Sequence, residues 1–497
     1  MNPIKQLAGQ TAIYGLSSIV ARLINYLLAP VVFTRAFAST ADFGIVTELY
    51  AYVAFVIIVL THGMETAFFR YHKDEGQTAY NTAFLSVFIF SILFWLIAVF
   101  KSNTIAAWIS YAEYSIYIQW FATILAFDAI ASIVFAKLRA DERPILFAVY
   151  KILNIGVNVI LVLILLEKIP GIDDSTFLVS FKSQINTWFP GIGKVGYVFL
   201  SNLAASTFAL LLLVPFIQFK FNFNITLWKK MAKYGFPILL VGLAGVTNDS
   251  IDKIMLKYLL PYSNETNMSM LGVYGACYKL SVLMTLFVQA FRFAGEPFFF
   301  KHADKENATQ IYADVMKCFV IIACCIFLGV GLFLDLFKYF IDARYWGGLY
   351  VVPILLFANL LFGVYYNLSV WYKVKDKTKY GAYISIGGGL LTIVLNFIWI
   401  PVFGYVGSAW ATLVCFSFMV TTSYFIGKKF LPVPYDLKRL FTYLLLSVIL
   451  ILCSQYFSVM ISKVIMSWIF NGLLFIVFAF VAYILDIKTL ISKSFRI

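Results

Sequence analysis

The architecture of this chain is set by residues 10–71, which read QTAIYGLSSIVARLINYLLAPVVFTRAFASTADFGIVTELYAYVAFVIIVLTHGMETAFFRY. An apolar helix carries Arg22 and Pro30 and ends before a short turn at Ser39–Asp42, and a second apolar helix then runs to Arg70. An arginine inside a membrane helix costs a few kcal/mol and usually has a function. Arg22 is therefore the first functional candidate, and a related pattern returns in the second half of the chain.

The composition predicts a polytopic membrane protein. Of the 497 residues, 62% are hydrophobic and only 12% are charged, whereas a soluble domain carries about 25% charged residues. The net charge of +14 is typical of basic loops that stay in the cytoplasm, so it does not indicate a nucleic-acid partner.

Apolar runs of about 20 residues can span a membrane as helices. Fourteen such runs predict an all-α fold. They lie at about 11–37, 43–66, 79–100, 114–136, 144–166, 195–218, 233–260, 271–297, 310–334, 347–371, 380–400, 405–427, 438–458 and 464–485.

The loops between these helices predict the orientation. Basic residues gather in the loops on one side: Arg70 and Lys73; Lys137, Arg139 and Arg143; Lys220, Lys229, Lys230 and Lys233; Lys301 and Lys305; Lys373, Lys375, Lys377 and Lys379; Lys428, Lys429, Lys438 and Arg439; and Lys488, Lys493 and Arg496. Positive charge resists translocation, so both termini are expected in the cytoplasm.

Four short matches recur in the same order and indicate an internal repeat. They pair residues 12–15 with 232–235, Gly44 and Tyr50 with Gly272 and Tyr278, residues 65–72 with 296–302, and residues 193–196 with 404–407. Each unit holds six helices, which predicts a parallel repeat with the binding site between the halves. The expected lobes are 1–220 and 221–430, joined by a basic linker around 222–233, and 431–497 form an additional helix pair.

Polar residues inside the first helix share one face, because Tyr14, Ser18, Arg22 and Asn25 follow three- and four-residue spacing. Arg22 could cap an interhelical contact or snorkel, but its depth favours a water-filled cavity. Further basic residues of the fifth, seventh and eighth helices could line the same cavity. The candidates for binding an anionic head group are Arg22, Asn25, Lys279, Lys253, Lys151 and Arg292; Lys151 could also snorkel, and Arg292 could pair with Glu296.

Acidic residues inside the predicted helices are candidates for binding a coupling cation, because a carboxylate in a low-dielectric environment must be protonated or paired. These candidates are Asp128, Asp249, Asp252 and Glu48. Asp249 and Lys253 are four residues apart and could instead neutralise each other on one helix face. Asp128 and Lys279 have no partner nearby in the sequence.

No catalytic constellation appears, so the chain is not expected to be an enzyme. There is no Walker A motif, and the six cysteines include no CxxC pair that would predict a metal site or a disulfide framework. The longest outward loop, Glu167–Lys194, could hold only a short surface helix. No cofactor is expected beyond a coupling H⁺ or Na⁺.

Two stretches carry a family resemblance. The turn Arg35-Ala-Phe-Ala-Ser-Thr-Ala-Asp-Phe43-Gly44 and the helix end Gly63-Met-Glu-Thr-Ala67-Phe-Phe-Arg70-Tyr71 resemble the polysaccharide-exporter branch of the multidrug/oligosaccharidyl-lipid/polysaccharide flippase superfamily. The resemblance implies a bacterial inner-membrane protein that moves polyprenyl-diphosphate-linked oligosaccharide from the cytoplasmic to the periplasmic leaflet by alternating access. It also implies a cationic central cavity, to which Arg22 and Lys279 would contribute.

Several functions remain open at this point. The first is a flippase for O-antigen, capsule or exopolysaccharide precursors, with the lipid bilayer and other polysaccharide-assembly membrane proteins as partners. A cation-coupled multidrug antiporter of the same superfamily is the alternative, although the intramembrane charges without near partners lean basic. Fourteen helices also resemble the lipid II flippase. A membrane glycosyltransferase or polymerase would need a larger outward loop, and a purely structural scaffold does not account for so many intramembrane charges.

Overall fold

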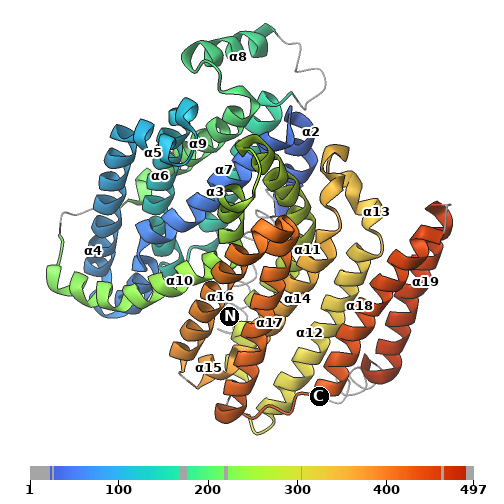
Figure 1. Cartoon of the computed structure of the whole chain (residues 1–497). Coiled ribbons are helices and arrows are strands. Elements are labelled where there is room, and N and C mark those ends of the chain that lie inside the picture. Colours follow the sequence, from blue (N-terminus) through green and yellow to red (C-terminus); the bar gives the residue numbers. More distant parts are fainter. Residues whose placement is uncertain are drawn as a thin grey trace. The chain divides into compact units, whose positions relative to one another are not determined.

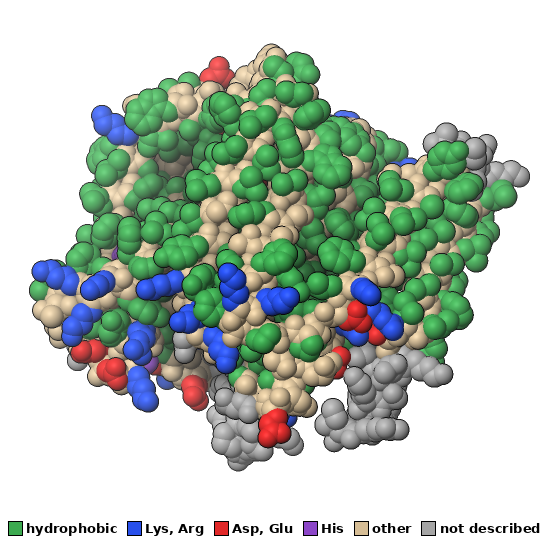
Figure 2. All heavy atoms as spheres, turned by 60° about the horizontal axis from the view of Figure 1, so that its bottom comes forward, with side chains coloured by type: hydrophobic (Ala, Val, Ile, Leu, Met, Phe, Trp, Pro, Cys, Tyr) green, Lys and Arg blue, Asp and Glu red, His purple; other side chains and the backbone are tan. Residues whose placement is uncertain are grey.

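The computed structural model describes residues 23–24, 27–167, 176–217, 222–303, 305–375, 377–460 and 464–487. Over these ranges every regular element is a helix and no strand occurs (Figure 1). The predicted all-α fold is therefore confirmed. Hydrophobic side chains cover much of the face drawn in Figure 2, as expected for a surface that contacts lipid.

The chain forms two compact units. Unit 1 holds residues 1–257 and 263–272, and unit 2 holds residues 258–262 and 273–497. The described elements of unit 1 are η1 (Ala29–Phe33), α2 (Thr34–Ala36), α3 (Thr40–Thr61), α4 (Met64–Phe100), α5 (Ser102–Trp108), η2 (Ala112–Tyr114), α6 (Ser115–Ala140), α7 (Pro144–Leu165), α8 (Thr176–Trp188), α9 (Gly193–Leu213), η3 (Val214–Phe216) and most of α10 (Ile225–Leu259).

The helix α11 (Asn264–Lys301) begins in unit 1 and continues into unit 2. The remaining elements of unit 2 are α12 (Ala308–Gly331), α13 (Leu334–Phe337), η4 (Lys338–Phe340), η5 (Ala343–Gly348), α14 (Val351–Leu368), α15 (Val370–Val374), α16 (Thr378–Phe403), α17 (Tyr405–Phe430), α18 (Leu437–Met460), α19 (Val464–Ala482) and η6 (Tyr483–Ile487). The predicted lobe boundary at residue 220 stays a prediction.

The predicted spans agree with these helices. Within the described residues, 11 helical segments are long and apolar enough to cross a membrane, and one of them, Thr40–Phe100, contains both the second and the third predicted spans. The predicted seventh span corresponds to α10, which is not among the 11. The first predicted helix, residues 11–37, lies largely outside the described residues.

Local sequence signals explain where α3 begins and ends. Ser39 caps its N-terminus, because the Ser39 hydroxyl accepts from the Asp42 amide and the Asp42 carboxylate accepts from the Ser39 amide. At the other end His62 and Gly63 adopt left-handed conformations, with φ of 32° and 74°. The predicted turn at Ser39–Asp42 is thus a capping box. Within α4, the backbone of Gly76 is not helical (φ 50°, ψ −121°), so the helix is interrupted there.

Most of the predicted linker at 222–233 is helical, because α10 begins at Ile225. Leu227, Met231 and Gly235 follow a four-residue spacing and are buried, while Lys229, Lys230 and Lys233 are exposed. This segment is therefore the amphipathic start of α10. Trp228 fixes it to α4, since its Nε1 donates to Ser86 Oγ at 2.9 Å.

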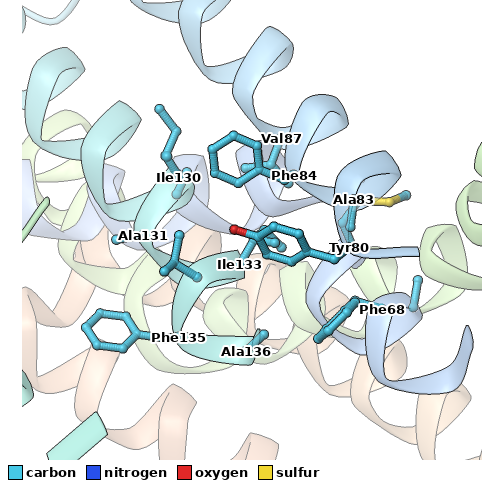
Figure 3. Close-up of a cluster of buried hydrophobic side chains, with 14 of the residues drawn as sticks. Phe68, Tyr80, Ala83, Phe84, Val87, Ile130, Ala131, Ile133, Phe135 and Ala136 are labelled. Atoms are coloured by element: carbon cyan, nitrogen blue, oxygen red, sulfur yellow. The ribbon is translucent and has the colours of Figure 1, made fainter. Parts of the chain in front are cut away.

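The core of unit 1 lies between α4 and α6. Phe68, Tyr80 and Phe84 of α4 and Ile133 of α6 are at most 4% exposed (Figure 3). Figure 3 shows these side chains converging from the two neighbouring helices, with Ala83 and Ala136 allowing the close approach. This apolar packing holds α6 in place and so positions the polar residues on its other face.

In unit 2, α18 and α19 are fixed to α12 by polar contacts at two levels. Asp486 in η6 accepts from Lys317 Nζ at 3.1 Å and from Tyr443 Oη at 2.5 Å. Farther along, Ser454 donates to Asn471, which donates to the Leu332 carbonyl oxygen, both at 2.7 Å. The helix pair predicted at 431–497 therefore packs on the α12 side of unit 2 (Figure 1).

The longest predicted outward loop contains one short helix, as expected. That helix, α8, has 13 residues. It is held near the rest of unit 1 because Tyr197 Oη donates to Asn186 Oδ1 at 3.0 Å and Trp120 packs edge-on against Phe189.

Candidate functional site

A polar network inside unit 1 surrounds Asp128 of α6. Ser206 of α9 forms a hydrogen bond with the Asp128 carboxylate, and Lys151 of α7 interacts with it electrostatically. Asn202 lies one turn from Ser206 on α9, and its Nδ2 donates to Tyr50 Oη of α3 at 2.7 Å. Tyr50 also interacts electrostatically with Asp128. We call these five residues the Asp128 network.

The backbone geometry explains why these side chains meet. Asn202 and Ser206 are four residues apart on α9 and therefore face the same direction. The Lys151 ammonium group lies over the Phe135 ring, with Nζ 4.6 Å from the ring centroid. Asn154 follows Lys151 by about one turn of α7. Its side chain donates to the Ala205 carbonyl oxygen at 3.2 Å and fixes α7 against α9. The four helices thus bring their polar atoms to one place.

The chemistry of the Asp128 network suits a small cation. Asp128 lies well inside its apolar span, residues 112–140, and its side chain is exposed although Ser206 beside it is 4% exposed. A carboxylate at such a depth must be protonated, paired or bound to a cation. Because its partners are a serine and a lysine that carries the opposite charge, binding of a proton or a metal cation would compete directly with Lys151.

A second buried centre joins α3 to α10. Glu48 Oε2 and Lys257 Nζ lie 3.0 Å apart, with side chains 0% and 1% exposed. Tyr111 Oη donates to Glu48 at 2.5 Å, its ring centroid lies 3.9 Å from Lys257 Nζ, and Tyr52 also hydrogen-bonds to Glu48. Lys257 Nζ donates as well to the Ile109 carbonyl oxygen at 2.5 Å. This centre is closed and charge-balanced, which favours a structural role.

The acidic residues of α10 lie close to Lys253. Its Nζ donates to the Asp252 carboxylate at 3.2 Å and to the Asp249 backbone carbonyl at 2.5 Å. Asp252 and Lys253 are buried, at 3% and 9% exposure, whereas Asp249 is exposed and accepts from Ser250 Oγ at 3.5 Å. Asp249 and Lys253 share the predicted face, where Lys253 contacts the Asp249 carbonyl oxygen, and Lys253 also contacts the Asp252 carboxylate.

Two predicted phosphate ligands lie on α11 within unit 2. Lys279 is half-buried, and Arg292 Nη1 donates to Tyr366 Oη of α14 at 3.2 Å. Thirteen residues of continuous helix separate them, or roughly 20 Å along the axis, so they do not form a single site. The Glu296 side chain lies outside the described side chains, and so do Arg22 and Asn25 of the first predicted helix.

Sequence reasoning did not assign the partners of these charges. Lys257 and Tyr111 were not predicted to contact Glu48, although an acid and a base inside neighbouring apolar segments are a signal for pairing. Tyr50, Asn202 and Ser206 were not singled out, because single polar residues are common in apolar helices. Of the predicted candidates, the structure brings Asp252 into contact with Lys253 and places Lys151 near enough to Asp128 for an electrostatic interaction.

Comparison with known sequences supports the predicted resemblance over part of the chain. A sequence model of the family described as "Polysaccharide biosynthesis protein" matches residues 32–171. This range contains Glu48, Asp128 and Lys151. A search of curated proteins found no significant match to the sequence.

Comparison with solved structures shows the fold. The chain is similar to "Lipid II flippase MurJ, inward closed conformation", with a TM-score of 0.70 and 15% identity over 95% of this chain and 98% of that chain. It is also similar to a "multidrug resistance MATE family transporter of the MOP superfamily" in its inward-facing conformation (TM-score 0.60, 12% identity, 84% and 94%) and to "MATE in the straight conformation" (TM-score 0.61, 14% identity, 86% and 96%). The resemblance predicted from the sequence is confirmed: this is a helical membrane protein whose fold is similar to those of the MurJ and MATE structures.

Proposed function

We propose that this protein is a flippase that moves polyprenyl-diphosphate-linked oligosaccharide from the cytoplasmic to the periplasmic leaflet. The observation that carries the proposal is the match of residues 32–171 to a polysaccharide biosynthesis family on a chain with the MOP fold. The glycan would be a precursor of O-antigen, capsule or another surface polysaccharide. The protein would act as a secondary transporter, not as an enzyme.

The extent of the structural matches favours a lipid substrate over a multidrug antiporter. The match to MurJ covers 95% of this chain, whereas the two MATE structures named above cover 84% and 86%. MurJ is a lipid flippase by its printed description. The match to MurJ also has the higher TM-score, 0.70 against 0.60 and 0.61, so the architecture of this chain agrees better with that of a protein that moves a lipid.

The Asp128 network is the proposed coupling site. It lies inside unit 1 and combines a mid-span carboxylate with a competing ammonium group. Binding of H⁺ or Na⁺ would cancel the electrostatic attraction between Asp128 and Lys151, and loss of the cation would restore that attraction. A change in the packing of α6, α7 and α9 would then follow the direction of the ion gradient, as alternating access by rigid bundles requires.

The same proposal implies a membrane location, an orientation and a set of partners. We place the protein in a bacterial inner membrane with both termini in the cytoplasm, in agreement with the basic loops. Its partners would be the bilayer, the lipid-linked glycan and other membrane proteins of polysaccharide assembly.

Translocation in proteoliposomes tests this function. The purified protein is reconstituted with a fluorescent polyprenyl-diphosphate oligosaccharide, and a membrane-impermeant quencher reports the outer-leaflet fraction over time. We expect movement between leaflets above that of protein-free vesicles, and no gradient-driven uptake of cationic dyes. Dye uptake without lipid movement, across several glycans, would replace the proposal by the antiporter function.

A further inference from the structure

The first turns of α10, in unit 1, carry an exposed surface on which lysines alternate with large apolar side chains (Figure 1). We call this set the α10 surface, and its members are Ile225, Lys229, Lys230, Lys233, Tyr234 and Phe236. The three apolar members are 53%, 40% and 59% exposed, in chain order. The sequence holds no acidic residue between Asp174 and Asp249, so this stretch of the chain supplies positive charge only.

Helix geometry places the α10 surface on the outer half of the helix. Successive residues are about 100° apart around the axis, and the six members therefore fall on one half of α10. Leu227, Met231 and Gly235 fall on the other half and are buried, and the first two belong to the core between α4 and α6. The inner half is thus packed on protein, and the outer half faces the surroundings.

The start of α10 is held in place by hydrogen bonds. The Asn224 side chain caps the helix, because its Oδ1 accepts from the Leu227 amide at 3.0 Å. The Asn224 amide donates to Thr82 Oγ1 of α4 at 3.4 Å, and Trp228 Nε1 donates to Ser86 Oγ at 2.9 Å. A ligand of the α10 surface would therefore meet a backbone that is already ordered, which lowers the entropic cost of binding.

The lysines of the α10 surface repel one another. Lys229 and Lys233 are four residues apart, and like charges at this spacing destabilise a helix. Within the part of the chain that the structure describes, neither they nor Lys230 form an ion pair or a hydrogen bond through their ammonium groups. An anion bound between these groups would remove the repulsion.

The position of the α10 surface favours a phospholipid as the source of that anion. The predicted seventh span begins at about residue 233, so the surface lies where α10 enters the membrane, and the basic loops predict that this end faces the cytoplasm. Lysines at such a boundary attract anionic headgroups. The aromatic and aliphatic side chains between the lysines favour the region where headgroups meet acyl chains. A phospholipid with a net negative charge satisfies both parts of the surface.

We propose that the α10 surface binds anionic phospholipids of the cytoplasmic leaflet. The lysines bind the phosphate groups, and Ile225, Tyr234 and Phe236 lie against the glycerol and the first methylene groups of the lipid. Bound lipid stabilises the folded protein, because it binds a surface that exists only when α10 is packed on α4. This inference goes beyond the proposed function, since it does not depend on what the protein transports.

Lipid binding to the full-length protein tests the proposal without any transport measurement. The protein in detergent is titrated with dioleoyl phosphatidylglycerol or dioleoyl phosphatidylcholine, and native mass spectrometry counts the lipid molecules bound. One double variant, Lys229→Gln with Lys233→Gln, removes charge, and a second, Lys229→Arg with Lys233→Arg, retains it.

The matched control is Lys375→Gln with Lys379→Gln. These two lysines are also exposed and four residues apart, and they belong to unit 2. The control therefore removes the same charge at the same spacing from another part of the protein. Thermal unfolding with and without lipid shows whether each variant is folded and whether the lipid stabilises it.

We expect the wild type to bind phosphatidylglycerol more tightly than phosphatidylcholine and to melt at a higher temperature when phosphatidylglycerol is present. Each lysine near a membrane surface contributes about fivefold to the binding constant of an anionic lipid. Lys229→Gln with Lys233→Gln should therefore bind phosphatidylglycerol roughly 25-fold more weakly and lose the shift in melting temperature. The arginine variant and the unit 2 control should bind as the wild type does.

Three results would overturn the proposal. Equal binding of the two lipids by the wild type would exclude a preference for anionic headgroups. Unchanged binding of phosphatidylglycerol by folded Lys229→Gln with Lys233→Gln would place the lipid elsewhere, and an equal loss in the unit 2 control would reduce the effect to overall charge. The proposed function is judged separately, because a wild type that flips no glycolipid leaves each of these binding results as it stands.

Discussion

Gly44 of α3 and Gly272 of α11 touch backbone to backbone, so that a Cβ on Gly272 would lie 3.0 Å from the Gly44 nitrogen and would overlap the Thr40 carbonyl oxygen. The two glycines are the positions that the predicted internal repeat pairs with each other. Thr40 Oγ1 and Ser269 Oγ, 2.6 Å apart, add a hydrogen bond at the same crossing. Residues that the predicted repeat pairs therefore form both sides of one close helix contact inside unit 1.

Replacing Gly272 with alanine should destabilise this contact. The added methyl group has no space, and overpacking of this kind costs about 1–3 kcal/mol. We expect a lower melting temperature for Gly272→Ala in detergent. Gly329→Ala in α12 is the control, because a Cβ there meets nothing within 4 Å and alanine favours a helix. Equal melting temperatures for the two variants would contradict the close contact.

Replacing Glu48 with glutamine should be strongly destabilising. The change leaves Lys257 buried without its counter-charge, and breaking a buried ion pair in this way costs about 3–5 kcal/mol. The double variant Glu48→Gln with Lys257→Met should recover much of the lost melting temperature, because both charges are then absent.

An exposed ion pair provides the comparison for that experiment. Lys338 and Asp335 lie 2.7 Å apart, with side chains 22% and 57% exposed, so Asp335→Asn should cost about 1 kcal/mol or less. If Glu48→Gln unfolded at the same temperature as Asp335→Asn, the Glu48 centre would not contribute to stability as described.

Replacing Asp486 with asparagine should loosen α18 and α19 from α12. Asp486 pairs with Lys317 at 3.1 Å and with Arg439 at 3.3 Å, and the asparagine would leave both cations without this carboxylate. Hydrogen exchange of α18 and α19 amides should become faster. Asp436→Asn removes a more exposed partner of Arg439 and should leave the exchange rates nearly unchanged; faster exchange in both variants alike would argue against a specific role for Asp486.

The fold could be predicted from the sequence where local patterns were sufficient. The lengths of the apolar runs predicted where the helices lie from the second predicted span onward. The turn at Ser39–Asp42 predicted where a helix begins. The segment after Asn222 was missed as a helix because only spans of about 20 apolar residues were considered, although the four-residue spacing of Leu227, Met231 and Gly235 indicates one.

The partners of the candidate residues could not be predicted in the same way. Glu48 and Lys257 are 209 positions apart in the chain, and Asp128 draws its partners from three other helices. No periodicity along a helix reports which face meets which neighbour, so the sequence identified Asp128 as a candidate and the structure identified Lys151, Ser206 and Tyr50 around it. The repeat likewise matched Gly44 with Gly272 as equivalents, without predicting that they touch.

The central claim is tested most directly by measuring which ion gradient drives glycolipid movement. Initial flipping rates in proteoliposomes would be measured with and without an imposed H⁺ or Na⁺ gradient for wild type, Asp128→Asn and the control Asp335→Asn. Asparagine can still accept the Ser206 hydrogen bond, so the fold should be retained while the cation site is lost. We predict that one gradient accelerates the wild type and the control several-fold and leaves Asp128→Asn at its basal rate. Equal acceleration of all three proteins would contradict coupling at Asp128, and no flipping by the wild type would contradict the flippase itself.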